Sequence, residues 1–289
     1  MRVMRRAAPA VALGLGLLLV PDAQVAPTAI SLVAVDQTTS VDFGDGVVLV
    51  LALGADSEGN ADAIELIALN LETGDSAAVG IPRDTVVEFD GERAKINDGL
   101  PRGGAQQMAD TVAELTGVQP QYVVTTNSAG FEALVDEIGP ITVDSEFDFE
   151  DPATGVAFTK GPNVLDGFEA TAFARSRELP DNDFDRMANQ QSLLHAILEQ
   201  LRDHEGDEGF VESGAVAAVK HLDTNLSPVD LYRFAQAISQ VKPAQATTCV
   251  LTGPTVVDDV LGSIVNLDAA YAGRVAADAA DDGHLDGGC

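Results

Sequence analysis

The sequence predicts a single domain of the mixed α/β class, in which helices pack in layers against a β-sheet. Apolar runs of strand length alternate with segments of helical periodicity over much of the chain. The chain has 289 residues and is 46% hydrophobic, which is enough for one large core and excludes disorder of the whole chain. No internal repeat or low-complexity linker divides it.

Three neighbouring strands are predicted first. The run VVLVLALG (47–54) is almost continuously apolar, which is typical of a buried strand. AIELIALN (63–70) alternates in part, a turn follows at ETGD, and SAAVGI (76–81) returns as the next strand. This order brings the loop 54–62 and the segment 82–85 to the same edge of a sheet.

Helices and strands alternate in the middle of the chain. Val112 and Leu115 are spaced as on one face of a helix that Gly117 ends. Ser128 is the expected N-cap of the next helix and Gly139 its stop. These signals predict helices at 104–116 and 128–139 and strands at 122–126 and 141–143.

The second half of the chain is predicted to be mostly helical. Apolar residues recur at helical spacing from 185 to about 204, and SPVDLYRFAQAISQV opens with a serine cap and a proline in the first turn. The final segment ADAADDGHLDGGC is expected to be a solvated tail. The segments predicted here are helices at 166–176, 185–204 and 227–241 and a late strand at 246–253.

The charge of the chain is strongly negative. It carries 16 basic and 46 acidic residues, a formal net charge of −30. General nucleic-acid binding is therefore not expected, because no basic surface is available to displace counterions from a phosphate backbone. Only four of the bases are lysine, which favours solubility at high salt. An acidic secreted protein would have the same composition, and the sequence does not separate the two.

The N-terminus has the form of an export signal. Three arginines within the first six residues precede an uncharged stretch from Ala7 to Pro21, and small residues follow. The apolar part spans roughly 21 Å as a helix, less than the roughly 30 Å core of a bilayer. Residues 1–26 are therefore either a cleaved signal peptide or, if apolar residues 25–35 extend the span, a membrane anchor. Both place the rest of the chain outside the cytoplasm, either secreted or held at a membrane surface.

The two cysteines, Cys249 and Cys289, make an even count for an oxidising compartment. We favour a disulfide that ties the C-terminus to the late strand and contributes about 3–4 kcal/mol in the chain-entropy model. The four histidines show no ligand spacing with the cysteines, so a zinc site is not expected.

Arginines gather in two segments of this acidic chain. Arg83 lies in GIPRDT, and Arg175, Arg177 and Arg186 lie in ARSRELPDNDFDRMANQQ, around a loop between two helices. A guanidinium donates two parallel hydrogen bonds to phosphate, so four arginines folded together would form a phosphate site. The alternative is pairing with acids nearby in the chain, which contributes only about 0–1 kcal/mol for each exposed pair. Such pairs would be Arg83 with Asp84, Arg177 with Glu178, and Arg186 with Asp183 or Asp185.

The loop DSEGNAD (56–62) offers carboxylates of the kind that a hard cation such as Mg²⁺ accepts. In isolation this loop fits a solvated turn in an acid-rich protein. If this loop lies beside the arginines, a magnesium site is favoured, because a metal and guanidinium groups together neutralise the charge of a diphosphate during transfer.

These segments, in this order, resemble the LytR-CpsA-Psr family of extracytoplasmic phosphotransferases, which attach glycopolymers to the cell wall. The resemblance covers roughly residues 46–255. It implies a mixed central β-sheet sandwiched by α-helices, an apolar pocket for a polyprenyl chain and a charged mouth for its pyrophosphate. Its markers are an aspartate at position 62 and the motifs LGAD, GIPRDT, KIN, ARSR, DFDR and NQQ.

The resemblance implies a charged site made of metal ligands, catalytic residues and substrate-binding residues. The residues that match the magnesium ligands are Asp56 and Asp62. Those assigned to catalysis are Arg83, Asp84, Arg175, Arg177 and Asp183. Those assigned to substrate binding are Lys95, Arg186 and Gln190. Asp84 and Asp183 are the candidates for a general base, although an aspartate paired to arginine would be a poor one.

The activity implied is transfer of a glycopolymer from a polyprenyl-pyrophosphate carrier to a hydroxyl of a cell-wall acceptor. One alternative is hydrolysis of the same substrate. The other is a non-catalytic envelope protein that only binds polyprenyl phosphates. The non-catalytic alternative stays open because the sequence departs from the family pattern at positions where the family commonly has arginine, serine or threonine. The residues at these positions are Asn60, Ala61, Ala63 and Asn189.

The predicted elements divide the chain into four parts. These are a signal peptide or anchor (1–26), a linker (27–45), the catalytic domain (46–255), and a C-terminal extension with an acidic tail (256–289).

Overall fold

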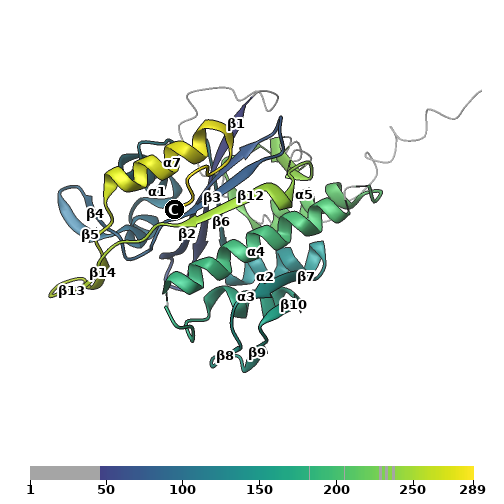
Figure 1. Ribbon diagram of the computed structural model, residues 1–289, viewed down its shortest axis with the longest axis horizontal. Helices are drawn as coiled ribbons and strands as arrows, with labels where there is room; N and C mark the ends of the chain where they lie inside the picture. The colour runs from purple at the N-terminus through teal and green to yellow at the C-terminus, as the bar shows by residue number, and fades with distance from the viewer. Residues whose placement is uncertain (1–45, 182, 205, 228–229, 232–233, 236–237) are drawn as a thin grey trace, which may run out of the picture. The chain divides into compact units, whose positions relative to one another are not determined.

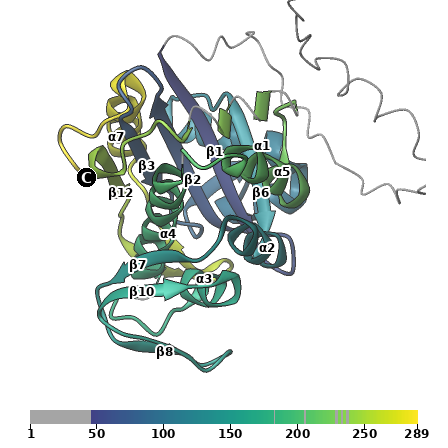
Figure 2. The same cartoon turned by 90° about the vertical axis from the view of Figure 1, so that its right-hand side faces the viewer.

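The computed structural model describes residues 46–289, except for 182, 205, 228–229, 232–233 and 236–237. The described residues belong to one compact unit, in which helices lie on both faces of a central sheet (Figures 1 and 2). The predicted mixed α/β class is confirmed. The signal peptide or anchor and the linker predicted for residues 1–45 lie outside the described residues. In the part of the chain that the structure describes, no helix combines the length and the apolar character needed to cross a bilayer.

The central sheet has six strands in the order β11-β6-β1-β2-β3-β12. Of the three predicted neighbours, β2 lies in the middle and runs antiparallel to both β1 and β3. The sheet is mixed, because β6 runs parallel to β1 and β12 runs parallel to β3. The strands are β1 (Val47–Ala55), β2 (Ala61–Asn70), β3 (Ser76–Gly80), β6 (Tyr122–Asn127), β11 (Asp223–Thr224) and β12 (Ala246–Val250).

Helices α1 (Gly99–Thr116) and α7 (Ala269–Asp282) cover one face of the sheet. Met108 of α1 and Ala276 of α7 pack with Leu51 and Leu66 of the sheet in one apolar core. α1 begins five residues earlier than predicted. Gly104 inside it has a φ of 69°, a kink that separates the first turn from the periodic part.

The solvated tail predicted for the end of the chain is wrong. In α7, Ala272, Ala276 and Ala279 are buried against the sheet, and Leu285 beyond it is 5% exposed. Alanines at helical spacing let the helix approach closely, while Asp281 and Asp282 at its end are exposed. The domain therefore continues well past the boundary predicted at residue 255.

Helices α2 (Ser128–Ile138), α4 (Asp183–Asp203) and α5 (Phe210–His221) lie over the opposite face, and the described residues between 230 and 238 are also helical. The N-cap of α2 is Asn127 rather than the predicted Ser128, since its side chain accepts a hydrogen bond from the backbone N–H of Gly130. α3 (Gly167–Arg175) packs against α2 and α4 and begins with a capping box formed by Asp166 and Glu169.

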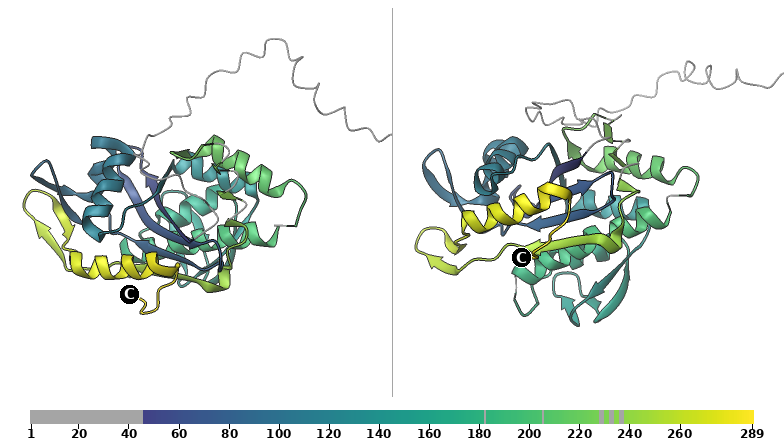
Figure 3. Two further views of the ribbon diagram at one scale, coloured as in Figure 1. Left: turned by 90° about the horizontal axis from the view of Figure 1, so that it is seen from above. Right: turned by 45° about the horizontal axis from the view of Figure 1, so that its top comes forward.

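Four smaller antiparallel pairs complete the described part of the chain, and of their strands only β7 was predicted. The hairpins β4–β5 and β13–β14 project side by side from the domain (Figures 1 and 3) and are linked by an ion pair between Arg93 and Asp258. The strands are β4 (Val86–Phe89), β5 (Glu92–Lys95), β7 (Ile141–Ser145), β8 (Phe149–Asp151), β9 (Val156–Phe158), β10 (Gly161–Leu165), β13 (Thr255–Asp258) and β14 (Gly262–Val265). Two 3₁₀ turns, η1 (Ile96–Asp98) and η2 (Pro243–Gln245), lie between elements.

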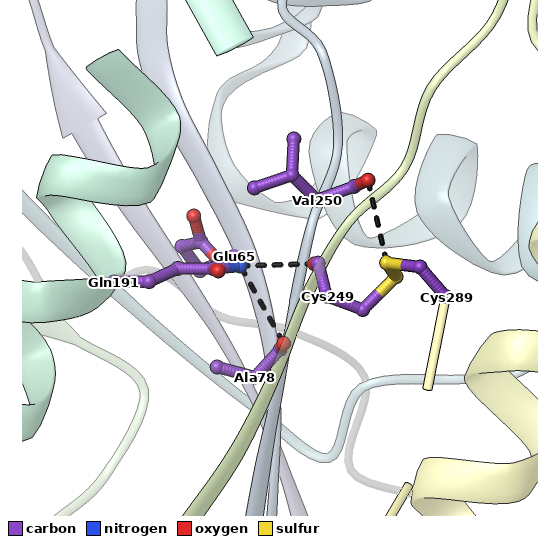
Figure 4. Close-up of a disulfide and its surroundings, with 6 residues drawn as sticks. All are labelled: Glu65, Ala78, Gln191, Cys249, Val250 and Cys289. Carbon is purple, nitrogen blue, oxygen red and sulfur yellow. Dashed lines mark hydrogen bonds between the residues drawn. A yellow bond between two sulfur atoms is a disulfide. The ribbon is translucent and has the colours of Figure 1, made fainter. Parts of the chain in front are cut away.

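Cys249 and Cys289 are joined in a disulfide, with their Cα atoms 5.3 Å apart (Figure 4). Cys249 lies in β12, the edge strand of the sheet, and is buried. The bond ties the end of the chain, after α7, to the sheet that α7 covers.

Candidate functional site

Charged residues from three parts of the fold meet at one edge of the central sheet. Asp62 stands at the start of β2, and Arg83 follows β3 at the same edge, as the strand order predicts. Asp183 and Arg186 come from the first turn of α4, and Arg177 comes from the loop that precedes it. The loop between α3 and α4 therefore folds over the sheet edge, which brings both arginine segments into one cluster.

Two aspartates in this cluster are each shared by the same three arginines. Asp62 lies 2.5 Å from Arg83, 3.6 Å from Arg177 and 3.7 Å from Arg186, measured between carboxylate oxygens and guanidinium nitrogens. Asp183 lies 3.5 Å, 3.9 Å and 3.0 Å from the same three side chains. We call these five residues the arginine cluster.

Burial differs sharply among the three arginines. The side chains of Arg186, Arg83 and Arg177 are 1%, 17% and 48% exposed. Burial lowers the pKa of Arg186, although Asp183 opposes this effect. Burial also acts to lower the pKa of Arg83, but Asp183, Asp62 and Asp84 outweigh it, so that the pKa is raised. Arg177 is the member of the cluster most accessible to a ligand.

Lys95 and Asp84 support the cluster from its side. Lys95 Nζ lies 2.7 Å from Asp84, whose other carboxylate oxygen is 3.9 Å from Arg83 Nε. The β4–β5 hairpin supplies Lys95, which explains why the KIN segment accompanies GIPRDT.

Arg175 lies outside the arginine cluster and pairs with Asp151, a residue that the sequence analysis missed. Arg175 Nη2 is 3.2 Å from Asp151, whose side chain is 6% exposed. Burial acts to raise the pKa of Asp151, but hydrogen bonds from Thr154 and Arg175 lower it overall. The β8–β9 hairpin holds Asp151 in place, because Phe158 packs against Phe173 of α3 with ring centroids 5.2 Å apart. The turn sequence DPATG was the available signal.

Simple pairing between neighbours in the chain accounts for only part of these contacts. The pairs Arg83–Asp84 and Arg186–Asp183 do occur. For Arg177, however, the ion-pair partners among the described residues are Asp62 and Asp183, not the adjacent Glu178.

Asn189 and Gln190 hold the end of α3 against α4. Asn189 Nδ2 donates to the carbonyl of Phe173, and Gln190 Nε2 donates to that of Ala174 at 3.1 Å. These carbonyls belong to the last turn of α3, which lacks intrahelical partners. Asn189, a departure from the family pattern, therefore contributes to placing Arg175.

Asp56 is fixed by its own loop. One carboxylate oxygen accepts the backbone N–H groups of Glu58 and Asn60 at 2.8 and 2.9 Å, and the other accepts Asn60 Nδ2 at 3.1 Å. Burial acts to raise the pKa of Asp56, but these hydrogen bonds lower it overall. Asn60, the first departure from the family pattern, thus orients a carboxylate that stays ionised.

A cavity of about 610 Å³ lies between the sheet and the helices of the opposite face. Along β2 its lining runs from Asp62 to Leu69, roughly 23 Å at the rise of a strand. Its walls are mostly apolar, with side chains such as Phe131 of α2 and Leu198 of α4. Besides Asp62, the charged and polar residues of its lining include Asp56, Arg175, Arg186 and Gln190.

A second cavity of about 340 Å³ adjoins the first, and the two share Asp62 and Arg175. Arg177, Glu178 and the tip of the β8–β9 hairpin complete its lining. The apolar cavity and the polar one therefore meet at the edge of the arginine cluster.

Glu65 is a buried acid in the wall of the apolar cavity. The sequence analysis also missed this residue. Gln191 Nε2 donates to Glu65 at 3.2 Å and to the carbonyl of Cys249 at 2.9 Å (Figure 4). Burial raises the pKa of Glu65 to about 8. The signal was a single charge inside the otherwise apolar strand AIELIALN.

The donor set for a divalent cation is small. No group of three or more histidine, cysteine, aspartate or glutamate side chains within the described residues could hold a metal ion. Asp56 and Asp62 nevertheless line the same cavity, and each presents carboxylate oxygens. Mg²⁺ keeps several waters and is commonly bound by one or two carboxylates together with substrate phosphates. Two carboxylates at the charged part of the cavity fit that pattern.

An apolar cavity that ends at clustered arginines has the chemistry needed to hold an amphiphile with an anionic head group. The chain belongs to the LytR_cpsA_psr family, because the family model matches residues 25–275. The resemblance seen in the sequence is thereby confirmed.

Curated relatives include two kinds of Bacillus protein. The polyisoprenyl-teichoic acid–peptidoglycan teichoic acid transferase TagU of Bacillus licheniformis is 36% identical over 156 residues, which cover 52% of this chain and 50% of that protein. The corresponding transferase TagV of Bacillus subtilis is 27% identical over 206 residues, 68% of this chain and 52% of that protein. The chain thus spans about half the length of these relatives.

Solved structures confirm the fold. The crystal structure of Bacillus subtilis TagV superposes with a TM-score of 0.72 at 24% identity, covering 80% of this chain and 95% of that chain. TagT bound to LI-WTA superposes with a TM-score of 0.69 at 25% identity, covering 83% of this chain and 92% of that chain.

Proposed function

We propose that this protein is an extracytoplasmic phosphotransferase that moves a glycopolymer from a polyprenyl-pyrophosphate carrier to a hydroxyl of a cell-wall acceptor. The apolar cavity that meets the arginine cluster is the observation that carries the proposal. Relatives named as teichoic acid transferases, and TagT bound to LI-WTA, support the same substrate class.

In this proposal the two cavities divide the substrate between them. The apolar cavity takes the start of the polyprenyl chain. The diphosphate lies where both cavities share Asp62 and Arg175, within reach of the half-exposed Arg175 and Arg177. The second cavity then leaves room for the glycan and for the acceptor hydroxyl.

The reaction converts a phosphoric anhydride into a phosphodiester. The acceptor oxygen attacks the phosphorus next to the glycan, the bond from that phosphorus to the bridging oxygen breaks, polyprenyl phosphate leaves, and the proton of the acceptor hydroxyl passes to water. Arginines stabilise the charge on the leaving phosphate. Asp84 pairs with Lys95, and Asp183 pairs with Arg186. A loose transition state needs little help from a base, so positioning and charge carry most of the rate.

Magnesium belongs to this proposal as a cofactor. Asp56 and Asp62 would hold it, and its charge would add to that of the arginines on the diphosphate. Asn60 supports the binding of a cation by keeping the Asp56 carboxylate oriented.

The proposal can be tested in a transfer assay that contains the full-length protein, a labelled lipid-linked glycan and peptidoglycan fragments. Wild type is expected to move the label onto the fragments, and Arg177→Ala to lower the rate at least about 100-fold, in the range measured when a charge-stabilising donor is removed. Arg93→Ala is the matched control, because Arg93 lines neither cavity and is 54% exposed. Release of free glycan without any transfer would contradict the transferase and point to a hydrolase.

A further inference from the structure

We infer that a divalent cation at Asp62 and a diphosphate at the arginine cluster bind with positive cooperativity, because Asp62 itself occupies the arginines until a cation draws it away. The inference rests on the proposed function and adds an order of events at the same site. Without a cation, the charge of the three arginines is then partly neutralised by Asp62 and Asp183.

Both carboxylate oxygens of Asp62 face guanidinium groups. Oδ1 accepts a hydrogen bond from Arg83 Nη1, while Oδ2 lies 3.6 Å from Arg177 Nη2 and 3.7 Å from Arg186 Nη1. A guanidinium N–H directed at a carboxylate is not free to donate to a phosphate oxygen. Asp62 therefore competes with the diphosphate for an N–H of Arg83 by hydrogen bonding, and for the positive charge of Arg177 and Arg186 by ion pairing.

The other candidate metal ligand behaves differently. The hydrogen-bond partners of Asp56 lie within its own loop, at Glu58, Gly59 and Asn60, and no ion pair joins it to an arginine among the described residues. Asp56 and Asp62 thus line the same cavity and carry the same charge, but only Asp62 occupies the arginine cluster. Comparing variants of Asp56 and Asp62 therefore distinguishes competition for the arginines from a general effect of negative charge on phosphate binding.

A cation changes the balance in a simple way. The cation would attract the Asp62 carboxylate and repel the guanidinium groups. The arginines would then be available to bind the diphosphate. By thermodynamic linkage, a bound diphosphate must raise the affinity for the cation by the same factor. A factor of about tenfold is expected, within the range of roughly 5–150-fold that is typical of coupled sites. Asp183 stays in place throughout and keeps the buried Arg186 paired.

The first experiment measures binding of inorganic diphosphate by calorimetry to the full-length protein in the presence of a chelator. Asp62→Asn is expected to bind about tenfold more tightly than wild type, because only one of the two carboxylates that pair with the three arginines is left. Asp56→Asn is the matched control and should gain much less, since it removes the same charge from the same cavity without releasing an arginine. Wild type is also measured with Mg²⁺.

The second experiment uses Mn²⁺ alone as the cation probe and does not depend on the fold of the Asp62 variant. Arg177→Ala removes a competitor for Asp62 and should raise Mn²⁺ affinity. Arg175→Ala is the matched control, because it removes the same charge from the edge of the same cavity but releases Asp151. Equal effects of the two variants would mean that only net charge matters, and would overturn the inference.

The outcomes separate the inference from the function on which it rests. One outcome is that wild type binds diphosphate in the presence of Mg²⁺ but that, without metal, Asp62→Asn binds it no more tightly than wild type does. The coupling is then overturned and the proposed function stands. If wild type binds no diphosphate under either condition, both fall.

Discussion

At the scale of single residues, Glu65 shows what an apolar cavity does to an acid. Its side chain is 3% exposed, and one of its oxygens has no hydrogen-bond partner among the described residues. Burial raises its pKa from 4.5 to about 8, so the folded protein holds the carboxyl neutral near pH 7. A neutral wall suits a hydrocarbon ligand better than a charged one.

This pKa shift gives stability a specific pH dependence. Between about pH 4.5 and pH 8 the unfolded chain releases the Glu65 proton while the folded chain keeps it, so the free energy of unfolding falls as pH rises. Glu65→Gln removes this slope, and its stability relative to wild type should therefore increase from pH 5 to pH 8. Urea unfolding at the two pH values measures the change. An equal difference at both values would contradict a raised pKa.

The contrast between predicted and missed residues follows from what a sequence contains. Arg83, Arg177 and Asp183 could be placed near one another because strand order and motif resemblance both point to one sheet edge. Asp151 and Glu65 could not, since their roles depend on which side chains tertiary packing brings opposite them. Asp151 is matched to Arg175 only because the β8–β9 hairpin packs on α3.

At the scale of elements, the contact between α2 and α3 is unusually close. A Cβ atom added at Gly167, the first residue of α3, would lie 2.1 Å from the carbonyl oxygen of Glu132 in α2. The chain therefore needs glycine here to bring α3, and with it Arg175, against the helices that cover the cavity.

Gly167→Ala should consequently force α3 away from α2 and destabilise the fold by about 1–3 kcal/mol, the usual effect of overpacking. Gly214→Ala in α5 is the matched control, because the nearest side-chain atom there is an ordinary 3.7 Å away. It should be neutral or gain up to about 1 kcal/mol from helix propensity. Chemical unfolding of both variants measures the difference, and similar stabilities for the two would argue against the close contact.

Elements with a long and regular apolar pattern could be predicted from the sequence. Elements that depend on tertiary packing could not. β1 to β3 and α4 carry apolar patterns that are long enough to identify them. The small hairpins have strands of three to five residues, too short for a period to show. The end of α7 was taken for part of a tail because aspartate and glycine make up most of ADAADDGHLDGGC, while the alanines that face the sheet carry little hydropathy.

At the scale of the whole molecule, the disulfide joins residues 40 positions apart. In the chain-entropy model, closing such a loop contributes about 4 kcal/mol. Cys289→Ser should lower the free energy of unfolding by up to that amount, and by less to the extent that α7 and Leu285 already hold the end of the chain. Reductant should lower wild type to the level of the variant without changing the variant, and unequal levels would show that the serine acts in another way.

The sheet that forms one wall of the cavity is assembled from opposite ends of the sequence. β12 lies parallel to β3 at its edge, where Thr247 hydrogen-bonds to Ser76, 171 residues earlier. Gln191 crosses from α4 to bind both Glu65 and β12. On a chain synthesised from its N-terminus, this wall cannot close until residue 250 has emerged. The lipid binding proposed for this cavity therefore requires β12, and chains truncated or stalled before residue 246 should have no binding competence.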